Sequence, residues 1–295
     1  NPLPVRDIAF RLANGRIAAS GQVRGPDGVV RVADVTIAHD LSRGTGEAKL
    51  AVPGITFSER LRPEQLTPTT FGIISAVSGS VRGDGLIRWS PAGVTSTGEF
   101  TADGIDLAAA FGPVTGLETT IRFTDLLALE SAPGQVATVA TLNPGVPVTD
   151  GVFRYQTLSG SRVRVEGARW PLAGGELILE PTLLDFSRPV KRYMTFRIVG
   201  LDARTFLQTF DYENLDATGT FDGELPIVFD ADGGELVNGR LVARDGGSLA
   251  YRGEVSKENL GTWGNLAFGA LRSLKFKALE LTLDGPLAGN IVTRA

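Results

Sequence analysis

Residues 161–166 read SRVRVE, a run that alternates apolar and charged residues with a period of two. In an extended chain this spacing places Val163 and Val165 on one face, and Arg162 and Arg164 on the other. The pattern is typical of a β-strand with one face buried and the other in water. We therefore predict an amphipathic strand here.

The same alternation recurs along the whole chain. It appears as ADVTIAH over 33–39, as TTIRFT over 119–124 and as ALELTLD over 278–284. Between such runs lie pairs that tolerate positive φ and favour tight turns: Asn14-Gly15, Asp27-Gly28, Asp150-Gly151, Asp222-Gly223, Asn238-Gly239 and Asp245-Gly246. One-sided alternation joined by tight turns predicts a mostly β chain with a long antiparallel sheet and one apolar face.

Helical signals are few. Residues 106–111 and 202–210 each begin with an aspartate of the N-cap type, and apolar residues between 256 and 274 recur on one helical face. The stretches FTADGID (100–106) and FRIVGLD (196–202) share one pattern, which suggests an internal repeat of strand and short helix. Residues 54–70, rich in Pro and Thr, are expected to form a linker or long loop.

The composition argues against most catalytic classes. The chain has 295 residues, no cysteine and a single histidine, His39. Cysteine-based or histidine-rich metal sites cannot form, and a Ser-His-Asp site would have to use His39. His39 ends an alternating strand, so we expect it to be structural. Residues 230–235 (DADGGE) resemble the opening of a calcium loop but lack its later glutamate, so we expect a hairpin turn there.

Charge and hydrophobicity narrow the choice of partner. The formal net charge is −4 and no basic stripe occurs, so nucleic acid is not expected as a partner. Hydrophobic residues make up 42% of the chain, which is enough for a large core. The apolar faces carry small and medium side chains with widely spaced phenylalanines. Such a face is either ordinary core or the lining of a groove for an acyl chain.

Five stretches, from about residue 101 onward, resemble the YdbH family of AsmA-like envelope proteins. They are LNPGVPVTDG (142–151), RWPLAGG (169–175), GTFDGELP (219–226), NGRLVARDGGSLAY (238–251) and ALRSLKFKALELTLDGP (270–286). The resemblance is faint before residue 101. We divide the chain into a first β segment, 1–100, and an AsmA/YdbH-like β segment with short helices, 101–295, or treat it as one continuous fold.

The resemblance implies a fold and a function. It implies a long antiparallel sheet curled into a U-shaped trough with an apolar interior. It also implies a periplasmic part of an inner-membrane-anchored protein, without the anchor itself, that carries phospholipid toward the outer membrane. Its partners would be phospholipid acyl chains and a small outer-membrane lipoprotein of the YnbE type, which pairs by a strand near the C-terminal end. No metal or other cofactor is implied.

We therefore expect a set of apolar side chains to line a lipid groove: Ile8, Phe10, Val35, Ile37, Ile121, Phe123, Phe153, Phe196, Ile198, Phe221, Leu279, Leu281 and Leu283. Two other readings remain open. One is a structural or protein-binding β scaffold with no ligand groove. The other is a carbohydrate-active enzyme with two carboxylates facing each other across a cleft. The lack of catalytic motifs favours a protein that is not an enzyme.

Overall fold

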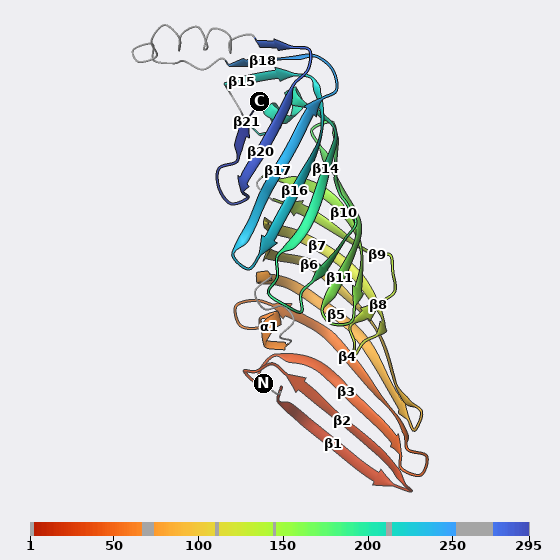
Figure 1. Cartoon of the computed structure of the whole chain (residues 1–295). Coiled ribbons are helices and arrows are strands. Elements are labelled where there is room, and N and C mark those ends of the chain that lie inside the picture. Colours follow the sequence, from red (N-terminus) through yellow and green to blue (C-terminus); the bar gives the residue numbers. More distant parts are fainter. Residues whose placement is uncertain are drawn as a thin grey trace. The chain divides into compact units, whose positions relative to one another are not determined.

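The computed structural model describes residues 3–66, 74–109, 112–143, 146–210, 214–251 and 274–294. They form one antiparallel sheet of 18 strands and a second sheet of three strands (Figure 1). The predicted class, a mostly β chain with a long antiparallel sheet and a few short helices, is confirmed. The described strands do not close the large sheet on itself, which is what an open trough requires.

The chain divides into two compact units. The first comprises Asn1–Ala168, Pro181–Arg192 and Asp230–Asp232, and the second comprises Arg169–Glu180, Tyr193–Phe229 and Gly233–Ala295. Strand β11 (Arg162–Leu172) contributes residues to both units.

The first unit is a meander, in which strands that follow one another along the chain are hydrogen-bonded neighbours (Figure 1). This order needs only short connections, which the tight turns supply. Strand β9 pairs with both β7 and β10, β8 with β7, and β13 with β11. The elements of the first unit are β1 (Val5–Ala13), β2 (Arg16–Arg24), β3 (Arg31–Asp40), β4 (Thr45–Phe57), α1 (Pro63–Leu66), β5 (Ile74–Ser90), β6 (Gly93–Ala109), β7 (Gly112–Asp125), β8 (Glu130–Ser131), β9 (Gln135–Leu142), β10 (Val148–Leu158), β13 (Thr182–Asp185) and the start of β11.

The second unit holds the rest of the large sheet and the whole of the small one. Strand β12 pairs with β14, and β20 pairs with β17 and β21. The small sheet consists of β15, β18 and β19. The elements of the second unit are β12 (Gly175–Leu179), β14 (Arg192–Asp202), α2 (Ala203–Thr209), β15 (Leu215–Thr218), β16 (Thr220–Asp230), β17 (Gly233–Ala243), β18 (Gly247–Tyr251), β19 (Leu274–Phe276), β20 (Glu280–Pro286) and β21 (Val292–Arg294).

The Asn-Gly and Asp-Gly pairs that were expected to make turns lie partly in turns and partly inside strands. Asn14 and Gly15 both have positive φ, 49° and 71°, and join β1 to β2 as predicted. The turn predicted within 230–235 is likewise present, at residues 231–232 between β16 and β17. Asn238, in contrast, has φ 53° inside β17, where the register with β20 shifts. The pairs at 150–151 and 222–223 also lie inside strands, so the turn prediction was wrong at these three places. Tolerance of positive φ suits bulges and other strand irregularities as well as turns.

One of the predicted helices is confirmed and one is wrong. Helix α2 begins after Asp202, whose carboxylate accepts a hydrogen bond from the Thr205 amide at 2.7 Å. The matching Asp106 instead lies within β6, because residues 107–109 pair with the start of β7. Its carboxylate accepts the Gly116 amide at 2.8 Å. Strand pairing has therefore overridden a local capping signal.

Two further expectations are only partly covered by the described residues. Residues 54–57 continue β4 and do not form a loop, so the predicted linker starts too early. Its next part is a tight turn closed by Ser58 and Leu61, followed by α1. Residues 67–70 of that linker, and nearly all of the helix expected over 256–274, lie outside the described residues.

Candidate functional site

Cross-strand register places the predicted apolar residues of the first unit on one face of the sheet. Directly paired residues of antiparallel strands project to the same side. The pairs form four rows: Phe10, Ala19, Ile37, Ala48 and Ile87; Gly21, Val35, Leu50, Gly85, Gly98 and Phe123; Val52, Gly83, Phe100 and Ile121; and Val81, Ala102, Thr119, Ala137 and Phe153.

The rows belong to one face because their members lie two residues apart along each strand. Val35 and Ile37 connect the first two rows, and Ile121 and Phe123 connect the second and third. A Cβ atom on Gly21 would lie 3.7 Å from the Ile8 side chain, which puts Ile8 beside the second row. All seven groove residues predicted in the first unit thus share what we call the apolar face.

The opposite face of the same strands is charged. Arg122 pairs with Glu99 at 2.6 Å, Arg82 with Asp103 at 3.4 Å, and Arg88 with Glu47 at 3.6 Å. Exposed pairs of this kind add little to the stability of the fold. Their value here is that they mark the wet side of a two-faced sheet.

The side chains of the apolar face are incompletely covered. Ile8, Phe10 and Leu12 on β1 are 69%, 65% and 57% exposed. Val35, Ile37, Ile121, Phe123 and Phe153 are each half-buried. A monomeric β protein that filled its interior with its own side chains would bury such residues. The protein's own residues therefore cover the apolar face only in part, least of all on β1.

Glycines on the apolar face leave room for large side chains that lie across them. A Cβ atom at Gly85 would lie 2.5 Å from Leu126, and one at Gly98 would lie 2.9 Å from the Phe100 ring. Phe100 also packs edge-on against Phe123, with 6.0 Å between ring centroids. In the sequence, this arrangement is signalled by glycines at alternate positions, such as Gly83 and Gly85.

Part of the apolar face is covered by the segment between β4 and β5. Leu61, only 1% exposed, packs among Val32, Ala33, Val52 and Ile55. Its position is fixed by two hydrogen bonds with Ser58, at 3.0 and 3.2 Å. A hydrocarbon chain therefore cannot occupy this part of the face unless Leu61 moves.

The few polar groups among the apolar rows are satisfied within the protein. The Tyr155 hydroxyl lies 2.9 Å from the Thr119 hydroxyl. Burial of the phenol raises the pKa of Tyr155, so the group stays neutral and does not draw charge or much water into the face. Near the hairpin turns, the Trp89 indole N–H donates to Nδ1 of His39 at 3.0 Å. The expectation that His39 is structural is thus supported.

The groove residues predicted in the second unit have two kinds of environment. Phe196, Ile198 and Phe221 are 3%, 5% and 6% exposed. Phe196 lies against Trp170, with 6.0 Å between ring centroids. Leu279, Leu281 and Leu283 are half-buried on one face of β20 and its preceding residue, and Leu281 pairs with Leu241. The side chains of the protein itself therefore cover more of the apolar surface here.

Several members of the apolar face were missed by sequence reasoning. They include Leu12, Ile17, Leu50, Ile87 and Phe100. Each lies in an alternating run, but only the strand register shows that these runs share a face. Within the described residues, no group of three or more His, Asp or Glu side chains could hold a metal ion.

The described helices include none that is long and apolar enough to cross a membrane.

Comparison with known proteins gives one result that covers the chain. Neither the curated proteins nor the solved structures yielded a significant match. The family model described as "YdbH-like: Intermembrane phospholipid transport protein YdbH" matches residues 2–295. The chain therefore belongs to the YdbH-like family, a family of intermembrane phospholipid transport.

Proposed function

We propose that this chain is a segment of an envelope-spanning bridge that carries phospholipid in an apolar groove toward the outer membrane. The observation that carries the proposal is the apolar face of the first unit, with large side chains that its own residues leave partly uncovered. Acyl chains lie on Phe10, Ile37 and Phe123, and headgroups stay in water.

Transport on such a surface is passive. Burial of each methylene contributes about 0.8 kcal/mol, and an equivalent contact is made wherever the chain lies along the rows. A lipid can therefore move along the face without a large change in free energy. No chemical step is required, so the protein acts as a conduit and not as an enzyme.

The proposed setting is the periplasm, in a protein anchored in the inner membrane by a segment outside this chain. Its proposed partner is a small outer-membrane lipoprotein of the YnbE type, joined by strand pairing near the C-terminal end. The short strand β21 and its three exposed residues support such pairing, because an accessible strand offers its backbone groups to another strand.

A second function, as a structural or protein-binding scaffold, is favoured by the second unit alone. Phe196, Ile198 and Phe221 are almost fully buried there, as in ordinary core. On this alternative the second unit holds the bridge together, and lipid contact is confined to the residues that remain accessible.

A photo-crosslinking experiment tests the proposal. A benzophenone amino acid replaces Phe123 in the full-length protein in cells, and a matched variant carries it at Thr124. These neighbours project to opposite faces of β7. Mass spectrometry should find phospholipid attached at position 123 and much less at 124. Absence of adducts from position 123, and also from 10 and 37, would leave only the scaffold.

A further inference from the structure

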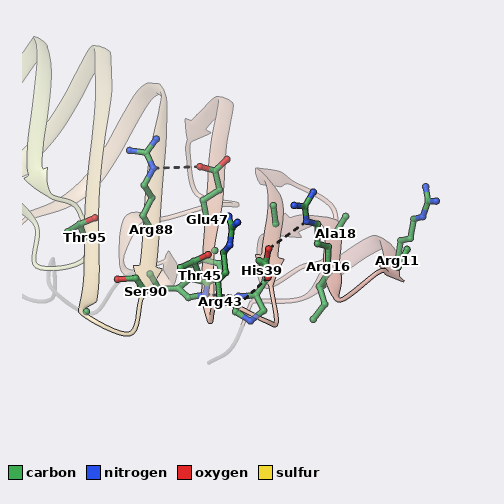
Figure 2. Close-up of a pocket in the computed structure, with 17 residues that line it drawn as sticks. Arg11, Arg16, Ala18, His39, Arg43, Thr45, Glu47, Arg88, Ser90 and Thr95 are labelled. Carbon is green, nitrogen blue, oxygen red and sulfur yellow. Dashed lines mark hydrogen bonds and ion pairs between the residues drawn. The ribbon is translucent and has the colours of Figure 1, made fainter.

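A shallow pocket of about 870 Å³ runs along one edge of the first unit (Figure 2). This edge carries the turns between β1 and β2, β3 and β4, and β5 and β6. We call it the hairpin edge. Four arginines from different strands and turns line the pocket: Arg11, Arg16, Arg43 and Arg88.

The form of the pocket follows from one cross-strand row on the charged face. In order, this row is Arg11, Ala18, Ala38, Glu47, Arg88 and Thr95. Two alanines in the middle give a low floor, and long polar side chains stand at either side. Figure 2 shows Arg11 at one end of this row and Arg88 next to Thr95 toward the other end.

The pocket has an excess of positive charge. It contains four guanidinium groups and two carboxylates, those of Asp40 and Glu47, which is an excess of two. The ion pairs are long, 3.7 Å from Arg16 to Asp40 and 3.6 Å from Arg88 to Glu47. In the described part of the chain, neither Arg11 nor Arg43 has a carboxylate within ion-pair distance. This is notable in a chain of net charge −4.

Asp40 is occupied by the turn that presents Arg43. Its carboxylate accepts the Ser42 hydroxyl at 2.6 Å and the amides of Ser42 and Arg43 at 3.0 and 3.2 Å. These hydrogen bonds, that of the Ser42 hydroxyl first, lower the pKa of Asp40. The carboxylate therefore holds the turn, and contributes only one long contact to the neighbouring guanidinium groups.

The apolar face ends at the same edge. Its last row contains Leu12, Ile17, His39 and Trp89, and the last three also line the pocket. Trp89 is half-buried and its N–H is hydrogen-bonded, which suits a boundary between apolar surface and water. An amphipathic molecule on this face would therefore place its polar end beside the arginines.

We propose that the hairpin edge binds the phosphate group of a lipid whose acyl chains lie on the apolar face. Guanidinium groups match phosphate oxygens in geometry and charge, and they bind them by paired hydrogen bonds. Arg16 and Arg43 supply the central contacts, with Arg11 and Arg88 at the ends of the pocket. This inference rests on the proposed function and adds a headgroup preference to it.

The test uses the full-length protein with a benzophenone amino acid at Ile37, on the row next to the edge. It is mixed with vesicles that contain equal amounts of phosphatidylglycerol and diacylglycerol. Arg16→Gln/Arg43→Gln is compared with Arg82→Gln/Arg122→Gln, which removes two arginines of the charged face outside the pocket. Circular dichroism checks that both variants fold.

The expected result is a ratio of phosphatidylglycerol to diacylglycerol adducts that falls about tenfold or more in the pocket variant and little in the control. An unchanged ratio, with adducts still formed, overturns the headgroup site but leaves lipid transport standing. No adduct of either lipid at position 37 in the unaltered protein counts against the proposed function itself.

Two further measurements identify the source of the anion. Millimolar inorganic phosphate should not abolish the preference for phosphatidylglycerol, because the acyl chains add affinity that the free ion lacks. If the ion removes the preference at low concentration, the site is one for free phosphate. A benzophenone group at Ala38, in the pocket floor, should capture lipid in cells. Capture of an acidic protein alone would overturn the assignment.

Discussion

Trp89 donates its indole N–H to His39 at 3.0 Å, and its ring passes over Gly46 on the strand between them. The three residues are one cross-strand row, since His39 pairs with Gly46 and Gly46 with Trp89. A methyl group at position 46 would overlap the indole, and it would also come within 2.7 Å of the Ala38 carbonyl oxygen. Glycine is therefore needed for packing at this position, without any requirement for positive φ.

The Gly46→Ala substitution should lower the free energy of unfolding by about 1–3 kcal/mol, the usual cost of forcing extra volume into a packed site. Denaturant unfolding measures the loss, and the tryptophan emission should shift to the red as the ring moves into water. A double-mutant cycle with Trp89→Ala provides the control, because Gly46→Ala should cost less once the ring is gone and only the close approach to the Ala38 carbonyl oxygen remains. An equal cost in both backgrounds would show that the ring is not the cause.

Much of the sheet could be predicted from the sequence, because alternation reports which side of a strand is apolar. The runs that contain Val35 and Ile37, and Ile121 and Phe123, were placed correctly as strands. Nothing local in the sequence states that these strands share a face. That depends on register, which is set by each hairpin and by bulges such as the one after Val52.

The features that the sequence did not predict correctly have the same origin, because they too depend on strand pairing. Asp106 carries the capping signal of Asp202 but is held in a strand by its neighbours in β7. The bond between His39 and Trp89 joins residues 50 apart in the chain, which periodicity cannot detect. Local patterns thus predicted the elements, whereas the site depends on pairings between distant residues.

The two units give opposite expectations for the groove residues. Phe10 is 65% exposed and Phe196 is 3% exposed. The Phe196→Ala substitution should cost about 3–5 kcal/mol of stability, because it leaves a cavity in packed core. The Phe10→Ala substitution should cost less than about 1 kcal/mol, since little packing is lost.

The effect on lipid binding should be larger for Phe10→Ala than for Phe196→Ala, the reverse of the order for stability. Native mass spectrometry of purified protein should find less bound phospholipid in Phe10→Ala than in the unaltered chain. Arg82→Ala is the control, because it removes a long side chain from the charged face outside the pocket and should leave the amount of bound phospholipid unchanged. A large loss of stability in Phe10→Ala would mean that this side chain belongs to the core.

Leu61 supplies another test, because it is the most buried side chain over the apolar face. The Leu61→Ala substitution should destabilise the first unit by about 2–5 kcal/mol and leave a cavity on that face. Thermal unfolding measures the loss. A benzophenone group at Val52, now facing that cavity, should give more lipid adduct than in the unaltered background. Leu66→Ala, on the rim of the same cluster, should have a smaller effect on both.

The cap of α2 gives an expectation for pH. The amide of Thr205 and then its hydroxyl donate to Asp202 and lower the pKa of that carboxyl below 3.8. The charged form is thus favoured in the folded protein. Its contribution to stability is fully present above pH 3.8, where the unfolded carboxyl is also ionised, and it is lost as the pH falls through the lower pKa of the folded state.

The Asp202→Asn substitution separates charge from capping, because asparagine caps a helix about as well as aspartate. At pH 7 the unaltered protein should be the more stable by a few tenths of a kcal/mol, up to about 1 kcal/mol, from the interaction of the carboxylate with the helix N-terminus. This difference should hold down to about pH 4 and shrink below it, as measured by urea unfolding at each pH. Asp202→Ala should be less stable than Asp202→Asn by about 1 kcal/mol at every pH in this range, since alanine removes the cap and neither side chain titrates. A difference between aspartate and asparagine that grows as the pH falls below 4 would contradict the assignment of a depressed pKa to Asp202.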